Sequence, residues 1–257
     1  MSRYNCLKKI YPDGTVQYKL YDYFIHVGES TRSAVAGSGA ERQITIEDYQ
    51  LNKLLKKRDS STKDKENRAR AIQKVYDYAK SNDFMWFCTF TVNPKICDSF
   101  NYIETLKELK KFRKYLTVHG LQYIIVPEQH ESGRWHFHGL ISEGLKVEQA
   151  FDQTGKELKG IFHVKDYKLG FTTATKIKSK ERTNTYITKY ISKALTVPKG
   201  YKRYWTSQGL ATPKEVASEV KVNSEEYFNI LHNNNDYFKR VDNEYGTLFI
   251  CEKQARS

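Results

Sequence analysis

The alternation of hydrophobic and polar positions predicts a small set of strands and helices. A strand is expected at residues 16–27 ("VQYKLYDYFIHV"), because aromatic and polar residues alternate there after a "YPDG" turn. Helical spacing of apolar residues predicts two helices in the middle of the chain, at residues 101–116 and 184–195. Further strands are predicted where β-branched and aromatic residues cluster or alternate, at residues 84–94, 121–129, 135–141 and 171–179.

The order of these elements predicts the fold class. From Phe84 to Leu195 the order is strand, helix, two strands, an insert, a strand and a helix. This split pattern favours an α+β fold, with an antiparallel central sheet and helices on one face, in a ferredoxin-like arrangement.

The flanking segments are expected to extend this core. Two helical patterns lie between Ile46 and Lys80, a polar helix is expected near residues 213–230, and "GTLFICEK" (246–253) is expected to be a strand. The expected domains are an N-terminal basic extension of a strand plus helices, an endonuclease-like core, and a C-terminal extension packing on that core, at residues 1–80, 81–198 and 199–257.

Charge adds a class of partner to this picture. The 257 residues contain 43 Lys and Arg against 30 Asp and Glu, a net charge of +13. Such a balance favours a polyanion, because Lys and Arg displace counterions from phosphates. Tyr, Phe and Trp interleaved with the basic residues favour single strands, whose bases can stack on aromatic rings. A merely basic surface would give the same charge.

Cysteine spacing and hydropathy indicate a cytoplasmic protein. The four cysteines include no C-x-x-C pair, so neither a zinc ribbon nor a disulfide framework is predicted. No apolar run approaches ~18–20 residues, and the N-terminus lacks an apolar signal core, so no membrane association is expected.

The stretch "HFH" contains the first candidate for chemistry. His136 and His138 are two residues apart on a predicted strand, so both project from one face, which we expect to be solvent-lined. If Gln129 pairs with Trp135 across the turn, Glu128 lies opposite His136 on the same face. Two imidazoles and one carboxylate suit a divalent ion such as Mg²⁺ or Mn²⁺.

Other interpretations of the same residues remain open. An isolated H-x-H is more often two hydrogen-bonded structural histidines than a metal site. His130 shares the parity of Glu128 and is a rival third ligand, although it falls in the turn. Iron oxygenases and cupins also use two histidines and one carboxylate. However, Glu143 has the wrong parity for such a site, and no second strand supplies the further histidine of a cupin.

The stretch "YITKYISK" contains the second candidate. Tyr186, Lys189, Tyr190 and Lys193 fall within an arc of about 100° on a helix. Two tyrosines at the edge of a core would explain the phenols but not the lysines, since an unpaired ammonium is costly to bury. A phenol can act as a nucleophile, and a neighbouring lysine can lower its pKa or stabilise a phosphate.

In this order, "WFCTFTVNP", "HFHGL" and "YITKYISK" resemble the motifs of the HUH-superfamily rolling-circle replication initiators of single-stranded DNA phages and small plasmids. The resemblance covers residues 84–195, and "YWTSQGL" (204–210) resembles a further segment of such proteins. It implies a metal-dependent, site-specific DNA-nicking and rejoining enzyme. Glu128, His136 and His138 would be its metal ligands, and Tyr186 and Tyr190, with Lys189 and Lys193, its catalytic residues.

The resemblance also implies partners. Single-stranded or hairpin origin DNA would be the substrate, and we expect Arg134, Trp135, Lys176 and Lys178 to contact it. No G-x-x-x-x-G-K-[ST] motif occurs, so a host helicase would open the strands and a host polymerase would extend the 3′ end.

Three alternatives stay open. Members with one catalytic tyrosine also carry Y-x-x-K, so either tyrosine could act alone. A relaxase or a transposase of the same superfamily is a second enzyme hypothesis, and a non-catalytic DNA-binding repressor with the same fold is a hypothesis from another class.

Overall fold

The chain forms two compact units. The computed structural model describes residues 3–26, 67–178, 197–198, 200–232, 235–243 and 246–254. Unit 1 combines residues 1–51 with 212–257, and unit 2 comprises residues 52–211. Unit 2 therefore contains all the metal ligands and DNA contacts predicted from the sequence.

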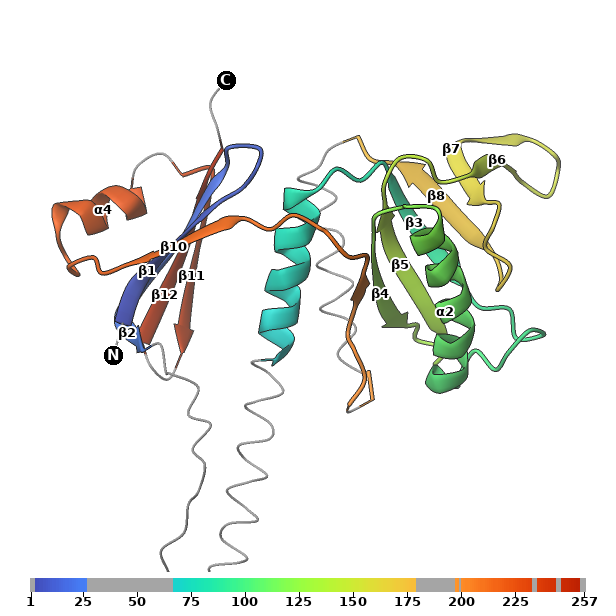
Figure 1. Cartoon of the computed structure of the whole chain (residues 1–257), viewed down its shortest axis with the longest axis horizontal. Coiled ribbons are helices and arrows are strands. Elements are labelled where there is room, and N and C mark those ends of the chain that lie inside the picture. Colours follow the sequence, from blue (N-terminus) through green and yellow to red (C-terminus); the bar gives the residue numbers. More distant parts are fainter. Residues whose placement is uncertain are drawn as a thin grey trace, which may run out of the picture. The chain divides into compact units, whose positions relative to one another are not determined.

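Unit 2 is built on a seven-stranded antiparallel sheet with the strand order β6-β7-β8-β3-β5-β4-β9 (Figure 1). Strands β3, β5 and β4 lie together near the middle of this order, so the motifs "CTFT" and "HFH" are neighbours. The strands are β3 (Trp86–Thr91), β4 (Tyr123–Gln129), β5 (Trp135–Ile141), β6 (Val147–Phe151), β7 (Glu157–Val164), β8 (Thr172–Lys176) and β9 (Trp205–Thr206).

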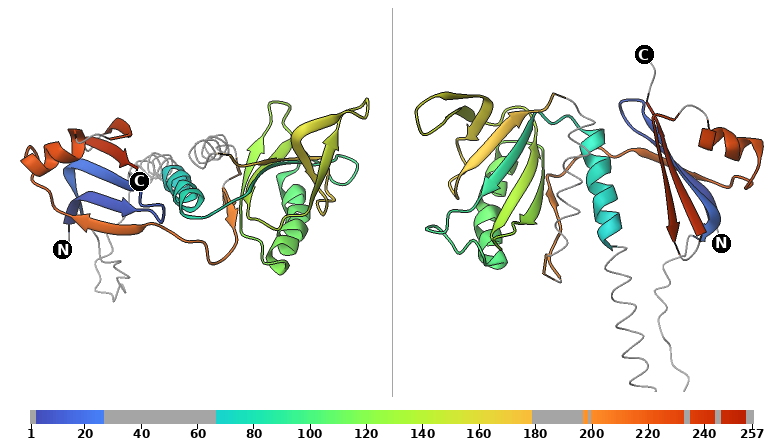
Figure 2. Two further views of the ribbon diagram at one scale, coloured as in Figure 1. Left: turned by 90° about the horizontal axis from the view of Figure 1, so that it is seen from above. Right: turned by 180° about the vertical axis from the view of Figure 1, so that it is seen from behind.

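Helix α2 (Tyr102–Val118) covers one face of this sheet, as Figure 2 shows from above. It begins at Asn101, whose side chain accepts hydrogen bonds from the backbone N–H groups of Ile103 and Glu104. Its buried residues belong to the same core cluster as the alternate residues of β3 that face them. Phe112, for example, packs on Phe90 with 5.2 Å between the ring centroids.

The opposite face is divided between packing and polar residues. Residues 67–81 are helical, and Val75 and Ala79 from this segment cluster with Ile124, Val126 and Leu140 of the sheet. The polar residues of β3, β4 and β5 share that face, because successive strand residues point to opposite sides. The predicted α+β fold with an antiparallel central sheet is confirmed, and the segment 67–81 adds a helix on the face opposite α2.

Unit 1 is a five-stranded antiparallel sheet with the strand order β10-β1-β2-β12-β11. A small core of Cys6, Leu20, Val220 and Tyr227 lies between the sheet and helix α4 (Glu225–His232). The elements are β1 (Arg3–Ile10), β2 (Val16–His26), β10 (Lys214–Ser218), β11 (Tyr237–Asn243) and β12 (Gly246–Lys253). The sequence suggested three consecutive segments, whereas here the first and last parts of the chain pair in one sheet.

One predicted helix in unit 1 is wrong in part. The sequence predicted a polar helix near residues 213–230, and the structure has β10 at Lys214–Ser218 before α4 begins at Glu225. The stretch "KEVAS" is rich in residues that favour helices, but its backbone pairs with β1, with Cys6 opposite Ser218 and Ile10 opposite Lys214. Pairing across the sheet here outweighs the local helix preference.

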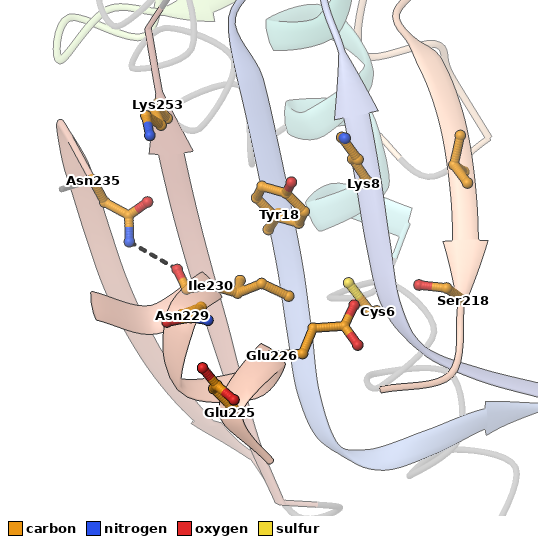
Figure 3. Close-up of a pocket in the computed structure, with 11 residues that line it drawn as sticks. Cys6, Lys8, Tyr18, Ser218, Glu225, Glu226, Asn229, Ile230, Asn235 and Lys253 are labelled. Atoms are coloured by element: carbon orange, nitrogen blue, oxygen red, sulfur yellow. Dashed lines mark hydrogen bonds between the residues drawn. The ribbon is translucent and has the colours of Figure 1, made fainter. Parts of the chain in front are cut away.

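The net charge is distributed unevenly between the units. The described residues of unit 1 include as many acidic as basic side chains, and those of unit 2 have a clear basic excess. A pocket of about 570 Å³ on unit 1 shows the same balance, with Glu225 and Glu226 facing Lys8 and Lys253 across it (Figure 3). The described part of the charge that favours a polyanion therefore lies on unit 2. Within the described residues, no helix is long and apolar enough to cross a membrane.

Candidate active site

The β4–β5 hairpin fixes which side chains share the candidate site. Glu128 pairs with His136 and Gln129 with Trp135, so the predicted register is confirmed. The turn is closed by backbone hydrogen bonds from His130 N to Arg134 O and from Gly133 N to His130 O, both 2.8 Å long. Gly133 has a φ of 84°, a conformation that residues with a Cβ rarely adopt.

His138 is held by hydrogen bonds at both ring nitrogens. Its Nε2 lies 2.6 Å from Oε2 of Glu128, and its Nδ1 lies 3.2 Å from Oγ1 of Thr89. A carboxylate only accepts, so Nε2 carries the proton in this arrangement and the Thr89 hydroxyl donates to Nδ1. The hydroxyl can equally accept from a protonated Nδ1, which would free the Nε2 lone pair to face a cation.

His136 lies beside this pair and is partly exposed. Its ring stacks on that of His130, with 5.4 Å between the centroids and 17° between the planes. Burial lowers the pKa of His136, charge on His130 and His138 lowers it further, and the Glu128 carboxylate opposes the shift. The ring is therefore kept neutral at neutral pH, which is the state that binds metal ions.

The histidine face is less open than the sequence suggested. We expected both histidines to face solvent, but His138 is 4% exposed. Its ring lies against Phe87 of β3, with 6.1 Å between the centroids and 17° between the planes. Phe87 shares the face of Thr89, so the apolar part of that face extends up to the histidine. His138 therefore contributes to packing as well as to the polar cluster.

The donor set has the chemistry of a divalent metal site. Glu128, His136 and His138 offer one carboxylate and two imidazoles from adjacent strands, and Thr89 can orient His138 from behind. As the side chains stand, no three His, Cys, Asp or Glu residues of the described ranges converge closely enough to enclose an ion. These residues fit a metal in identity and direction, with Glu128 and His138 already in contact.

A cleft of about 730 Å³ opens beside His136. Its walls include the end of β3, Arg134 from the hairpin, and the segment from Tyr167 to Phe171. Phe171 is 59% exposed at the cleft, and Phe100, 53% exposed, lies beneath the Arg134 guanidinium, whose carbon is 5.6 Å from the ring centroid. Exposed aromatic rings beside cations are suited to unpaired bases and phosphates.

Backbone contacts hold Phe171 in this wall. The Phe171 carbonyl accepts from the N–H and the hydroxyl of Thr91, both at 2.9 Å, and Asn93 N donates to Leu169 O at 2.9 Å. A Cβ on Gly170 would clash with the carbonyl oxygen of Thr91, so the close approach needs glycine. The wall is therefore fixed to the strand that also positions Thr89.

The four residues expected to contact DNA have different environments. Arg134 is exposed in the cleft, which agrees with a contact. Trp135 is 3% exposed and packs on Tyr102, with ring centroids 4.3 Å apart, so its ring offers no stacking surface and this assignment is wrong. Lys176 lies over the Trp86 ring on the α2 side of the sheet, away from the histidines, and Lys178 is exposed beyond the end of β8.

The tyrosine segment lies outside the described residues. Tyr186, Lys189, Tyr190 and Lys193 fall in the range 179–196, so their position relative to the histidines stays a prediction. Thr89, Phe100, Lys168 and Phe171 were not singled out from the sequence. Thr89 could have been found from the pairing of β3 with β5, which sets it opposite His138.

Replacing Thr89 with valine tests its proposed role behind His138. Valine keeps the size and branching but removes the hydroxyl, and loss of such an outer partner typically weakens metal binding about 10–100-fold. We expect a weakened affinity for Mn²⁺ in isothermal titration calorimetry. Thr173→Val is the matched control, because Thr173 lies opposite Thr89 on β8 and has the same face. Equal Mn²⁺ affinity in Thr89→Val and wild type would contradict the role.

Comparison with known families finds one match that covers the site. Residues 85–195 match the model of a family of replication-associated proteins, the ORF2 type. The matched range, less than half of the chain, begins just before β3, includes the β4–β5 hairpin and extends through the tyrosine segment. Neither curated proteins nor solved structures give a match. The family match supports a replication initiator role.

Proposed function

We propose that this protein nicks and rejoins single-stranded DNA at a replication origin, in the manner of the rolling-circle initiators of the HUH superfamily. The observation that carries the proposal is the convergence of Glu128 and His138, with His136 beside them, inside the range that matches replication-associated proteins. The basic excess of unit 2 and the exposed Phe171 and Phe100 beside the site support a nucleic-acid substrate.

The proposed chemistry is transfer of a phosphodiester to a tyrosine. The phenol oxygen of Tyr186 or Tyr190 attacks the scissile phosphorus and loses its proton, and the bond to the 3′ oxygen breaks. The 3′ oxygen takes up a proton and becomes a free 3′-OH, while the 5′-phosphate stays on the tyrosine. The new phosphotyrosine conserves the energy of the broken bond, so the reverse reaction rejoins DNA without another energy source.

The other residues hold the substrate for this step. Glu128, His136 and His138 would hold Mg²⁺ or Mn²⁺, which would polarise the phosphate and neutralise developing charge. Arg134 and Lys168 lie at the cleft, where their charges can neutralise neighbouring phosphates. Lys189 and Lys193 would keep a positive charge beside each phenol. A host helicase and a host polymerase would then open and copy the DNA.

The proposal is tested by incubating the protein with single-stranded DNA from the intergenic region of its replicon, with Mn²⁺ or with EDTA. Denaturing gels should show a metal-dependent cut and a protein–DNA adduct that survives denaturation. Binding without cutting under every metal condition would favour a non-catalytic DNA-binding protein. Cleavage without an adduct would point to a nuclease that uses water.

A further inference from the structure

The edge of the sheet formed by β9 contains a second group of cations, separate from the cleft beside His136. A pocket of about 460 Å³ lies there, and three of its lining residues are basic: Arg113 of α2, and Lys202 and Arg203 from the segment before β9. Tyr204, Trp205 and Asn67 supply further parts of its wall, and no acidic residue lines it among those the structure describes. The pocket therefore has the electrostatics of an anion site.

Arg113 is the best-positioned donor in this pocket. Its guanidinium carbon lies 5.3 Å from the centroid of the Trp205 ring, a distance typical of a cation–π contact. Its Nε is buried and makes no hydrogen bond with any described residue. A buried N–H without an acceptor is costly, and an incoming oxygen anion would remove that cost.

The segment that carries Lys202 is fastened to the sheet. The Tyr102 hydroxyl donates to the Lys202 carbonyl at 3.3 Å, and Trp205 pairs with Ile125 of β4. The Tyr123 N–H donates to the Ser207 hydroxyl at 3.1 Å just beyond β9. The cations are thus attached to the same strand that carries Glu128, and little ordering would be needed to bind an anion.

The pocket and the metal-site residues are too far apart to share one phosphate. Ile125, where β9 pairs, precedes Glu128 by three residues, or about 10 Å along the strand. A single strand of DNA that passes the histidines could place another of its phosphates at this edge.

We propose that the Arg113–Lys202 pocket is a second phosphate site, which binds the backbone of the DNA at a nucleotide away from the scissile phosphate. This inference rests on the proposed function, because it takes DNA as the substrate. Contacts to phosphate carry no sequence information, so the pocket would set the affinity and register of the strand and leave origin choice to other residues.

Binding measurements with matched charge changes test this site. Full-length wild type, Arg113→Gln, Lys202→Gln and Lys114→Gln are titrated into labelled single-stranded DNA in EDTA, with anisotropy recorded at several salt concentrations. Lys114 is the control, because it is exposed on α2 next to Arg113 and does not line the pocket. Each variant removes one charge, so general electrostatics alone would affect all three alike.

We expect each pocket variant to bind more weakly and to lower the slope of log K against log salt by about 0.7, the value for one phosphate contact on a single strand. Lys114→Gln should keep the wild-type slope. Lys202 is exposed, so a loss seen there cannot be attributed to core damage, and thermal unfolding checks Arg113→Gln.

A length series adds a second readout. An oligonucleotide long enough to reach both sites should show the penalty for Lys202→Gln, and one confined to the nick site should not. Excess inorganic phosphate should compete at the pocket and reduce the difference between wild type and Lys202→Gln.

The outcomes separate the two proposals. Equal slopes in wild type and both pocket variants would overturn the second site while nicking, measured separately, leaves the proposed function standing. An equal loss in Lys114→Gln would also overturn it, because the effect would then be general charge. If wild type itself fails to bind single-stranded DNA, the proposed function fails and the second site fails with it.

Discussion

Replacing His136 with alanine is expected to reduce metal-dependent nicking by more than about 100-fold, which exceeds the usual loss for an outer partner of a metal site. The reason is its position directly opposite Glu128, where it supplies one of three proposed ligands. Because the ring is partly exposed, the free energy of unfolding without metal should fall by less than about 1 kcal/mol. Gel assays of nicking and thermal unfolding in EDTA measure the two effects.

His138→Ala should behave differently from His136→Ala. His138 is buried and bonded to Glu128 and Thr89, so its loss should abolish nicking and also destabilise the metal-free protein by about 2–3 kcal/mol. His130→Ala tests the rival ligand and should keep most of the nicking activity, since His130 lies in the turn and only stacks on His136. Full nicking by His136→Ala would return the histidine pair to a structural role.

The double variant Tyr186→Phe/Tyr190→Phe is expected to form no covalent DNA adduct, whereas each single variant keeps some nicking. One turn of helix separates the two residues, about 6 Å along the axis, so both phenols could reach one phosphate after a modest shift. Rolling-circle synthesis ends with a second cut while the first tyrosine still holds the parental 5′ end. A second phenol on the same helix face could make that cut.

Peptide mapping of trapped adducts distinguishes one nucleophile from two. Adducts on both tyrosines in wild type would support the pair. If adducts appear on one tyrosine alone, and its Phe variant is inactive, the other tyrosine serves packing and the nickase proposal still stands. Binding of single-stranded DNA in EDTA is the control, because the double Phe variant removes two hydroxyls and no charge.

The sequence predicted the parts of the site that depend on local periodicity. Strand parity and a single hairpin register were enough to bring Glu128 opposite His136. The same parity also shows why Trp135 fails as a DNA contact. It is two residues before Phe137, which was expected to face the core, so both side chains point to the α2 side.

Contacts between distant segments could not be predicted in this way. Thr89 became relevant through the pairing of β3 with β5, and Phe171 through its hydrogen bonds to Thr91. The strand β10 was assigned to a helix because its residues favour one, and its edge position leaves all of its side chains exposed. Burial gives no signal in such a strand, so its periodicity carries no information about its partner.

The strand order of unit 1 constrains how the protein is made. Strand β12 lies between β2 and β11, and the buried hydrogen bond from Gln17 to Glu252 joins residues 235 positions apart. A ribosome therefore releases β1 and β2 long before their central neighbour exists, while the strands and helix α2 of unit 2 are already complete. Closing so long a loop is slow. The nascent chain thus passes through a stage with an open β2 edge, which is the stage at which chaperone binding or aggregation would act.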